Sequence, residues 1–157
     1  MNKFLLVISL GFVALSAQAL GVNSPISTLD KYVYETPQGR PMKIPHETKL
    51  IIVGFEKDTG ATVNDFLNTK DKYYLQKNKA IFIADIHAMP SVITEMFPLP
   101  KMKKYKHLIY LHYGEEFQKN TPNKDGEITI LRVDNRKISS ISYISTPKEL
   151  QAAIEKW

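Results

Sequence analysis

TKLIIVGFEKDTGATVNDFL, residues 48–67, carries the clearest fold signal in this sequence. It opens with a short apolar run rich in β-branched side chains, Leu50 to Val53, which is typical of a buried β-strand. Turn-forming residues follow, and Thr62 with Asp65 three positions later resembles the capping box that begins a helix. We therefore predict a buried strand that passes through a tight loop into a helix over residues 62–76.

Strand and turn signals on both sides of this stretch predict a sheet. Turn residues flank an alternating run at 31–34, which predicts a β-hairpin within residues 20–45 with this run as an edge strand. Residues 49–55 and 79–86 predict buried strands, and the near-continuous apolar run of the second suits a parallel sheet covered on both faces. Residues 107–113 are a third strand candidate. Between the last two we expect a short helix over 90–97, ended by Pro98-Leu99-Pro100.

The C-terminal part carries a second clear signal. After a polar loop over 114–126, two strand-like runs, 128–133 and 138–144, predict an antiparallel hairpin. Thr146-Pro147-Lys148-Glu149 then provides an N-cap, a proline at the first helical position and a glutamate at the third. The helix that begins there is expected to bury an apolar stripe formed by Leu150, Ala153, Ile154 and Trp157.

The predicted order is hairpin, β, α, β, α, β, long loop, β-hairpin, α. In this order, in the strand KLIIVGF (49–55) and in the closing ITILRVDNRKI (128–138), the chain resembles the thioredoxin-like fold superfamily, and more closely its periplasmic peroxiredoxin and thioredoxin-like branch. The resemblance covers about Gly21 to the C-terminus. It implies an α/β fold with a central mixed sheet flanked by helices, extended by an N-terminal β-hairpin.

Two features depart from this resemblance. Redox members carry Cys-x-x-Cys where the first strand meets the helix, here at about Thr59 to Val63, and this chain has no cysteine. Members also carry a cis-proline just before the final hairpin, near Gly126 here, whereas Pro122 is the nearest proline and lies too early. Thiol–disulfide exchange and thiol peroxidase chemistry both need a thiolate, so neither is open to this chain.

Residues 1–19 have the pattern of a secretory signal peptide: Lys3, an apolar run from Phe4 to Leu15, and Ala17-Gln18-Ala19. The apolar run is shorter than the roughly 20 residues that span a bilayer as a helix, which disfavours the alternative of an N-terminal membrane anchor. We expect cleavage after Ala19, leaving residues 20–157 as a single domain in the bacterial periplasm, with no transmembrane segment. A lipid anchor of the bacterial lipoprotein kind is excluded because no cysteine follows the signal.

Candidate binding residues lie at the expected start of the central helix. Lys57, Asp58, Thr59 and Thr62 are placed where free N–H groups and the helix dipole favour an anion. Ordinary capping by Thr59 or Thr62 is the alternative explanation. We name these four, together with Asp85 and His87, as binding residues and assign no catalytic residue.

Asp85 and His87 form a second candidate pair. They lie two positions apart at the C-terminal end of a strand, so they share a face at the rim where open α/β sheets hold ligands. The hypothesis for this pair is an acid–base or metal role. His107 and His112, five apart on one expected strand, face opposite ways and do not form a paired metal site.

Sequence motifs exclude several common classes. The chain contains no H-E-x-x-H, G-x-S-x-G, G-x-x-x-x-G-K or G-x-G-x-x-G, so we expect no cofactor and no metal. A formal net charge of +5 at pH 7 biases the chain toward acidic partners or anionic surfaces without identifying them, and a solvated lysine-rich exterior is the simpler explanation. Four lysines at 101–106 form a basic bend, for which a solvated loop is a simpler explanation than anion binding, and an exported protein is not expected to bind nucleic acid.

Two hypotheses for function follow. The first is an exported, non-redox thioredoxin-like module that binds a protein or peptide partner, or serves as an accessory protein, in the bacterial envelope. The alternative is a hydrolase or metal-dependent enzyme that uses Asp85 and His87. The two differ in whether a purified protein turns over a substrate.

Overall fold

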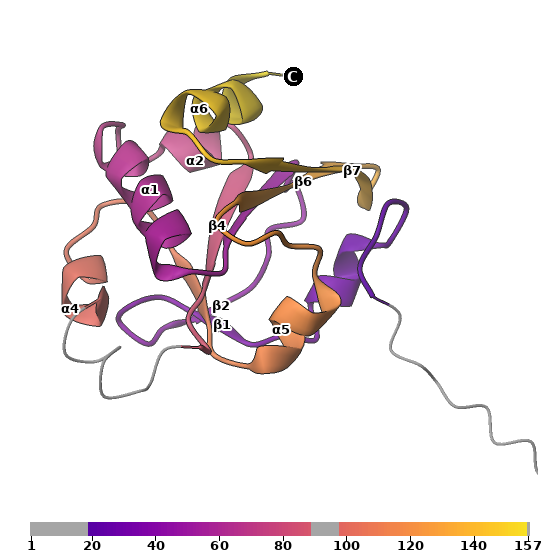
Figure 1. Ribbon diagram of the computed structural model, residues 1–157, viewed down its shortest axis with the longest axis horizontal. Helices are drawn as coiled ribbons and strands as arrows, with labels where there is room; N and C mark the ends of the chain where they lie inside the picture. The colour runs from indigo at the N-terminus through magenta and orange to yellow at the C-terminus, as the bar shows by residue number, and fades with distance from the viewer. Residues whose placement is uncertain (1–18, 89–97, 157) are drawn as a thin grey trace, which may run out of the picture.

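The computed structural model describes residues 19–88 and 98–156, and in them the strands form one seven-stranded sheet of order β2-β1-β5-β4-β3-β6-β7 (Figure 1). Strands β3, β4 and β5 are parallel, and the other pairs are antiparallel. The strands are β1 (Tyr34–Glu35), β2 (Pro41–Met42), β3 (Leu50–Gly54), β4 (Ala80–Asp85), β5 (Tyr110–His112), β6 (Ile128–Asp134) and β7 (Lys137–Ile144).

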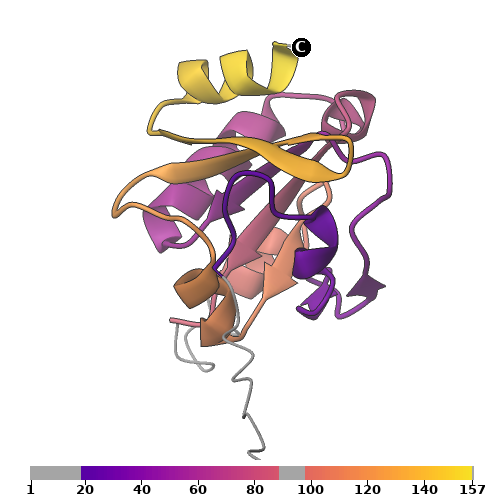
Figure 2. The same ribbon diagram turned by 90° about the vertical axis from the view of Figure 1, so that its right-hand side faces the viewer.

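Helices cover both faces of this sheet (Figures 1 and 2). One apolar core lies between the sheet and α1 (Lys57–Asn68), α2 (Tyr74–Lys77), α4 (Pro98–Met102) and α6 (Pro147–Glu155). The other core lies between the sheet and the short helices η1 (Ile26–Leu29) and α5 (Glu115–Asn120). The expectation of an α/β fold with a mixed sheet flanked by helices is confirmed.

The apolar run at 50–53 explains why β3 is central. All five residues of β3 are buried, with Leu50 and Ile52 in the α1-side core and Ile51 and Val53 in the other. Side chains of a strand alternate between faces, so a strand covered on both sides needs apolar residues at every position. Strand β4 is likewise buried over all six of its residues.

Helix α1 begins at Lys57, so the expected start at Thr62 is wrong. Glu56 is the N-cap in extended conformation, and its N–H donates to Thr59 Oγ1 at 3.1 Å. Thr62 is inside the helix, where its hydroxyl donates to the Asp58 carbonyl at 3.0 Å. The helix also ends at Asn68, well before residue 76, where Thr69 forms the C-cap and donates its hydroxyl to the Phe66 carbonyl.

Two further boundaries differ from the prediction, and one helix was not expected. Pro98-Leu99-Pro100 opens helix α4, because proline is tolerated in a first helical turn. The expected polar loop over 114–126 contains helix α5, and strand β5 begins at Tyr110, after residue 107. The predicted helix over 90–97 lies outside the described residues.

The C-terminal elements agree closely with those predicted from the sequence. Asn135 and Arg136, with φ of 47° and 62°, join β6 to β7 by a two-residue turn of the hairpin-forming type. Thr146 Oγ1 accepts the Glu149 N–H at 3.2 Å while the Glu149 carboxylate accepts the Thr146 N–H at 3.0 Å, so the capping box is confirmed. Trp157 lies outside the described part of the chain.

The N-terminal hairpin is present, but its edge strand is β2 and not the run at 31–34. Strand β1 pairs with β2 on one side and with β5 on the other, so it is an inner strand of the sheet. Gly39, at φ 79°, makes the tight turn between β1 and β2. Among residues 19–88 and 98–156, no helix is long and apolar enough to cross a membrane.

Candidate functional site

A cavity of about 220 Å³ opens where β3 and β4 end and α1 begins. Its walls come from the first two turns of α1, from the end of β4, and from α4 with the turn that follows it. Most of the lining is apolar, with Ala61, Ala84, Ile86, Met102 and Tyr105 among the residues that form it. Parallel α/β sheets hold ligands outside the carboxyl ends of their strands, and this cavity has that position.

Gly54 makes this arrangement possible. A Cβ atom at residue 54 would lie 3.2 Å from the Gly60 nitrogen and 3.3 Å from the Gly60 Cα atom. Both neighbours are helix backbone, which cannot move aside as a flexible side chain could. A glycine at the end of β3 therefore lets α1 start directly against the strand and brings its first turns to the cavity.

Hydrogen bonds of Thr59 and Glu56 hold the start of α1 in place. Thr59 is buried, and its hydroxyl accepts the Glu56 N–H and donates to the Glu56 carbonyl at 3.0 Å. The Glu56 carboxylate in turn accepts the Gly126 N–H at 2.8 Å. Thr59 thus caps the helix, and Glu56 ties the helix start to the turn that precedes β6.

The structure separates the predicted binding residues of the helix. Lys57 lines the cavity and is exposed, whereas Asp58 and Thr62 are not part of the lining and bond to each other on α1. The residues that do face the cavity, Lys57, Gly60, Ala61 and Asn64, have the i, i+3, i+4, i+7 spacing of one helix face. With the helix start at residue 57, this spacing would have identified them from the sequence.

Asp85 and His87 are brought together by the end of β4. Asp85 Oδ1 lies 2.9 Å from His87 Nδ1 and accepts the His87 N–H at 3.1 Å. The Asp85 side chain is fully buried, the His87 side chain is 16% exposed, and no described residue bonds to Asp85 Oδ2. A carboxylate that holds Nδ1 in this way leaves Nε2 as the nitrogen that can exchange a proton.

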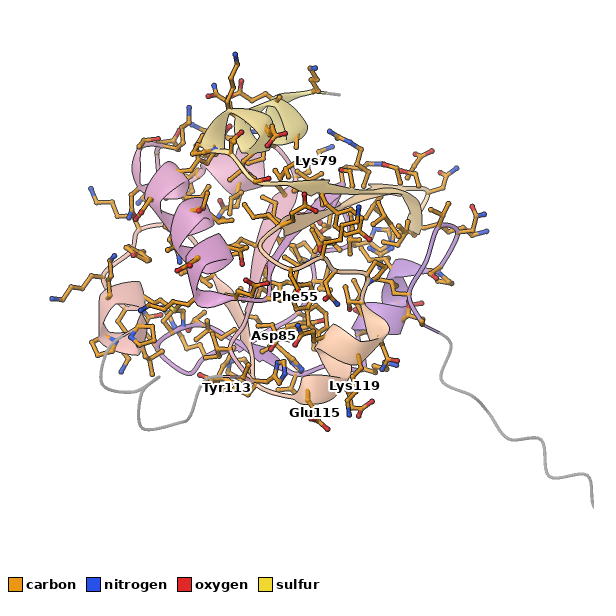
Figure 3. The ribbon with its side chains drawn as sticks, in the orientation of Figure 1. Phe55, Lys79, Asp85, Tyr113, Glu115 and Lys119 are labelled. Carbon is orange, nitrogen blue, oxygen red and sulfur yellow. The ribbon has the colours of Figure 1, made fainter. Side chains whose placement is uncertain are left out.

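Asp85 also borders the cavity, but its side chain is directed to the other face of the sheet. Ala84 and Ile86 belong to the α1-side core, so strand alternation places the Asp85 side chain on the face of Ile83. Figure 3 shows Asp85 at the same end of the molecule as Glu115 and Lys119 of α5, and far from Lys79. The Asp85–His87 pair is therefore a site distinct from the cavity.

Sequence reasoning missed the residues that support the cavity wall. His107 Nε2 lies 2.9 Å from Asn64 Oδ1, and its ring stacks on Tyr105 at 5.1 Å between centroids. Burial lowers the pKa of His107 from 6.5 to about 4, so at neutral pH the ring is uncharged. His112 bonds to the Val33 carbonyl on the other side of the sheet, so the two histidines do lie on opposite sides. The reason differs from the expected one, because His107 precedes β5 and is not part of that strand.

No group of three or more histidine, aspartate or glutamate side chains that could hold a metal ion occurs in the part of the chain that the structure describes. The basic bend at 101–106 is divided between α4 and the turn after it. Its first lysine, Lys101, lines the cavity, and the others are exposed next to it in the sequence.

Comparison with known proteins gives similarity in structure alone. No family model matches the sequence, and no curated protein matches it. The structure is similar to a putative protein disulfide isomerase from Bacteroides thetaiotaomicron, with a TM-score of 0.54 and 13% identity over 95% of this chain and 91% of that one. It is also similar to StoA from Bacillus subtilis, with a TM-score of 0.52 and 14% identity over 79% of this chain and 96% of that one.

A third similar structure is a SCO1/SenC family lipoprotein from Bacillus anthracis, with a TM-score of 0.52 and 8% identity over 89% of this chain and 95% of that one. At these identities the likeness concerns the fold. The mixed sheet, its flanking helices and these neighbours agree with the fold expected from the sequence, and the sequence contains no cysteine. The chain therefore belongs to the thioredoxin-like fold and lacks the Cys-x-x-Cys motif.

Proposed function

We propose that this chain is an exported, non-redox thioredoxin-like protein that binds a protein or peptide partner in the bacterial periplasm. The observation that carries the proposal is the cavity of about 220 Å³ at the start of α1. At this position redox members carry their thiols, and here Gly60 and Ala61 form part of an apolar wall instead. Without a thiolate, binding is the function that this position retains.

The size of the cavity favours one side chain of a partner over a whole small molecule. A cavity of about 150 Å³ accommodates benzene, whereas pockets for drug-sized ligands measure about 300–1,000 Å³. The cavity of this chain, at about 220 Å³, lies between these limits. It has room for one aromatic or branched aliphatic side chain, which is the anchor that peptide recognition commonly uses.

The usual peptide-pairing turn of the fold is altered in this chain, which supports docking at the cavity. The turn before β6 has no proline at 126–127, and the Gly126 N–H donates to Glu56 Oε1. An N–H that is bonded within the protein is not free to pair with an extended peptide. Docking through the cavity does not need this turn.

Filling the cavity is expected to weaken partner binding without unfolding the protein. Ala61 lines the cavity and is exposed, so Ala61→Trp places an indole in it, and affinity for a peptide selected from a random library should fall about tenfold or more. Asn68→Trp, on the exposed C-terminal end of α1, is the matched control and should keep its affinity. Unchanged affinity of Ala61→Trp, measured by fluorescence anisotropy, would contradict the proposed site.

The non-redox part of the proposal has its own test. Insulin reduction and peroxide consumption by the purified wild-type protein should both equal a buffer blank.

The proposed location predicts processing after Ala19. When the full chain is expressed in a Gram-negative host, the protein recovered from the periplasmic fraction should begin at Leu20. Intact-mass spectrometry measures this directly. A protein that keeps Met1 and stays with the membrane fraction would refute both the cleavage site and the periplasmic location.

The Asp85–His87 bond of 2.9 Å supports a second candidate function, a hydrolase with this pair as general base. A buried carboxylate that orients an imidazole is the arrangement found in catalytic triads. Under this alternative a purified protein would turn over a substrate, and His87→Ala would remove the activity while Ala61→Trp would not. A metal-dependent version would in addition show bound metal after purification without chelator.

A further inference from the structure

Exposed lysines lie at the cavity and next to it in the sequence. Lys57 and Lys101 belong to its lining, and Lys103, Lys104 and Lys106 are exposed neighbours of the lining residues Met102 and Tyr105. Among the residues that the structure describes, none of these five forms an ion pair, whereas Lys119 pairs with Glu115 at 2.8 Å. At the cavity the lysines therefore outnumber the one exposed carboxylate of the lining, that of Glu56.

Two carboxylates belong to residues that line the cavity. Glu56 is exposed and accepts the Gly126 N–H, which leaves its charge in place, and the Asp85 side chain is bonded to His87 on the other face of the sheet. The N-terminal end of α1, where Lys57 is the first helical residue, adds the positive end of the helix dipole at the same place. Lys57 and the positive end of the helix dipole would therefore attract an anionic group of a partner.

The cavity and its mouth differ in character, and this difference specifies the partner. The interior is largely apolar and holds one side chain, so a carboxylate has no place inside it. Lysine side chains can lay their methylene stems along an apolar wall and keep the ammonium group in water. The charged contacts therefore belong to residues that flank the buried side chain.

Building on the proposed function, we propose that the partner segment is acidic: a large apolar side chain enters the cavity, and aspartate or glutamate residues beside it meet Lys57, Lys101 and the lysines that follow. Exposed ion pairs are individually weak, but several of them act together at one mouth. The lysines then set which peptide is preferred, and the cavity sets whether a peptide binds at all.

Four matched peptides test this proposal against the full chain after export. Each has seven residues with a central phenylalanine or alanine, flanked by aspartates, asparagines or lysines. We expect the Asp–Phe peptide to bind about tenfold more tightly than the Asn–Phe peptide at low salt, with a smaller ratio at 0.5 M salt. The Lys–Phe and Asp–Ala peptides should bind least. Isothermal titration calorimetry measures each dissociation constant.

Charge reversal at the mouth provides the second part of the test. Lys101→Glu should remove the preference for aspartate, while Lys148→Glu, an equal charge change at the exposed start of α6, should keep it. Helix α6 lies at the other end of the molecule from α4 in Figure 1. Because both lysines are exposed, both variants should unfold at the wild-type temperature.

The outcomes separate this inference from the proposed function. Equal affinity for the Asp–Phe and Asn–Phe peptides, with both lost in Ala61→Trp, would overturn the acidic preference and leave the binding site standing. A preference that Lys101→Glu and Lys148→Glu weaken equally would show a general charge effect and would also overturn it. Failure of every phenylalanine peptide to bind, or binding that Ala61→Trp does not change, would overturn the proposed site itself.

Discussion

Removal of residues 150–157 is expected to lower the free energy of unfolding by about 4–10 kcal/mol. Leu150 and Ile154 of α6 are 0% and 1% exposed and belong to the α1-side core. Replacing one such side chain by alanine costs about 2–5 kcal/mol, and a domain of this size is stable by only about 5–15 kcal/mol. Losing both therefore takes most of the available stability. The unfolding transition followed by circular dichroism measures the effect.

The same helix offers a control for this truncation. Gln151 lies next to Leu150 but is exposed, so Gln151→Ala should change the free energy of unfolding by no more than about 0.5 kcal/mol. Leu150→Ala should cost about 2–5 kcal/mol on its own. A truncated protein with the wild-type unfolding temperature would show that α6 does not cover the core.

Acidification from pH 6.5 to pH 4 is expected to destabilise the protein through His107. Burial lowers the pKa of the folded-state imidazole from 6.5 to about 4. Between these values the unfolded chain binds a proton at this position and the folded chain does not, so stability falls as pH falls. The contribution is fully present above pH 6.5 and is lost by about pH 4. One pKa unit corresponds to about 1.4 kcal/mol, so the loss is on the order of 2 to 3 kcal/mol.

His107→Gln isolates this effect, because an amide N–H can still donate to Asn64 Oδ1 and does not titrate. Urea unfolding at pH 7, 5 and 4 should show a steeper loss of stability in the wild type than in this variant. Equal pH dependence of the two proteins in this range would contradict the assignment. Since Asn64 and Tyr105 line the cavity, acidification should also weaken peptide binding in the wild type.

Much of the fold is determined by signals that lie within a few residues of each other. The uninterrupted apolar residues of β3 and β4, the turn at Asn135-Arg136, and the capping box of Thr146 and Glu149 each act locally. Such elements form because of interactions between residues that are neighbours in the sequence. The absence of cysteine is likewise a property of the sequence, and it excludes thiol chemistry whatever the fold.

The start of α1 was decided by tertiary structure. Glu56 is not a favoured N-cap residue, so the residues around it gave a weaker helix-start signal than Thr62 with Asp65. Its position is fixed by Thr59 and also by Gly126, which is 70 residues away in the sequence. Placing the helix five residues too late hid the face formed by Lys57, Gly60, Ala61 and Asn64.

The cavity itself depends on contacts between distant segments. Its walls join α1, the end of β4 and α4, and the bond that supports them connects Asn64 to His107 across 43 residues. Asp85 and His87 were correctly expected to lie together, since they are two positions apart along the chain. Which face of the sheet they occupy relative to the cavity depended on the register of β4 between its neighbours. Local signals therefore specify strands β3 and β4, the closing hairpin and the last helix, and the absence of cysteine excludes thiol chemistry. The position of the cavity and of the lysines beside it follows from long-range packing, which brings their segments together.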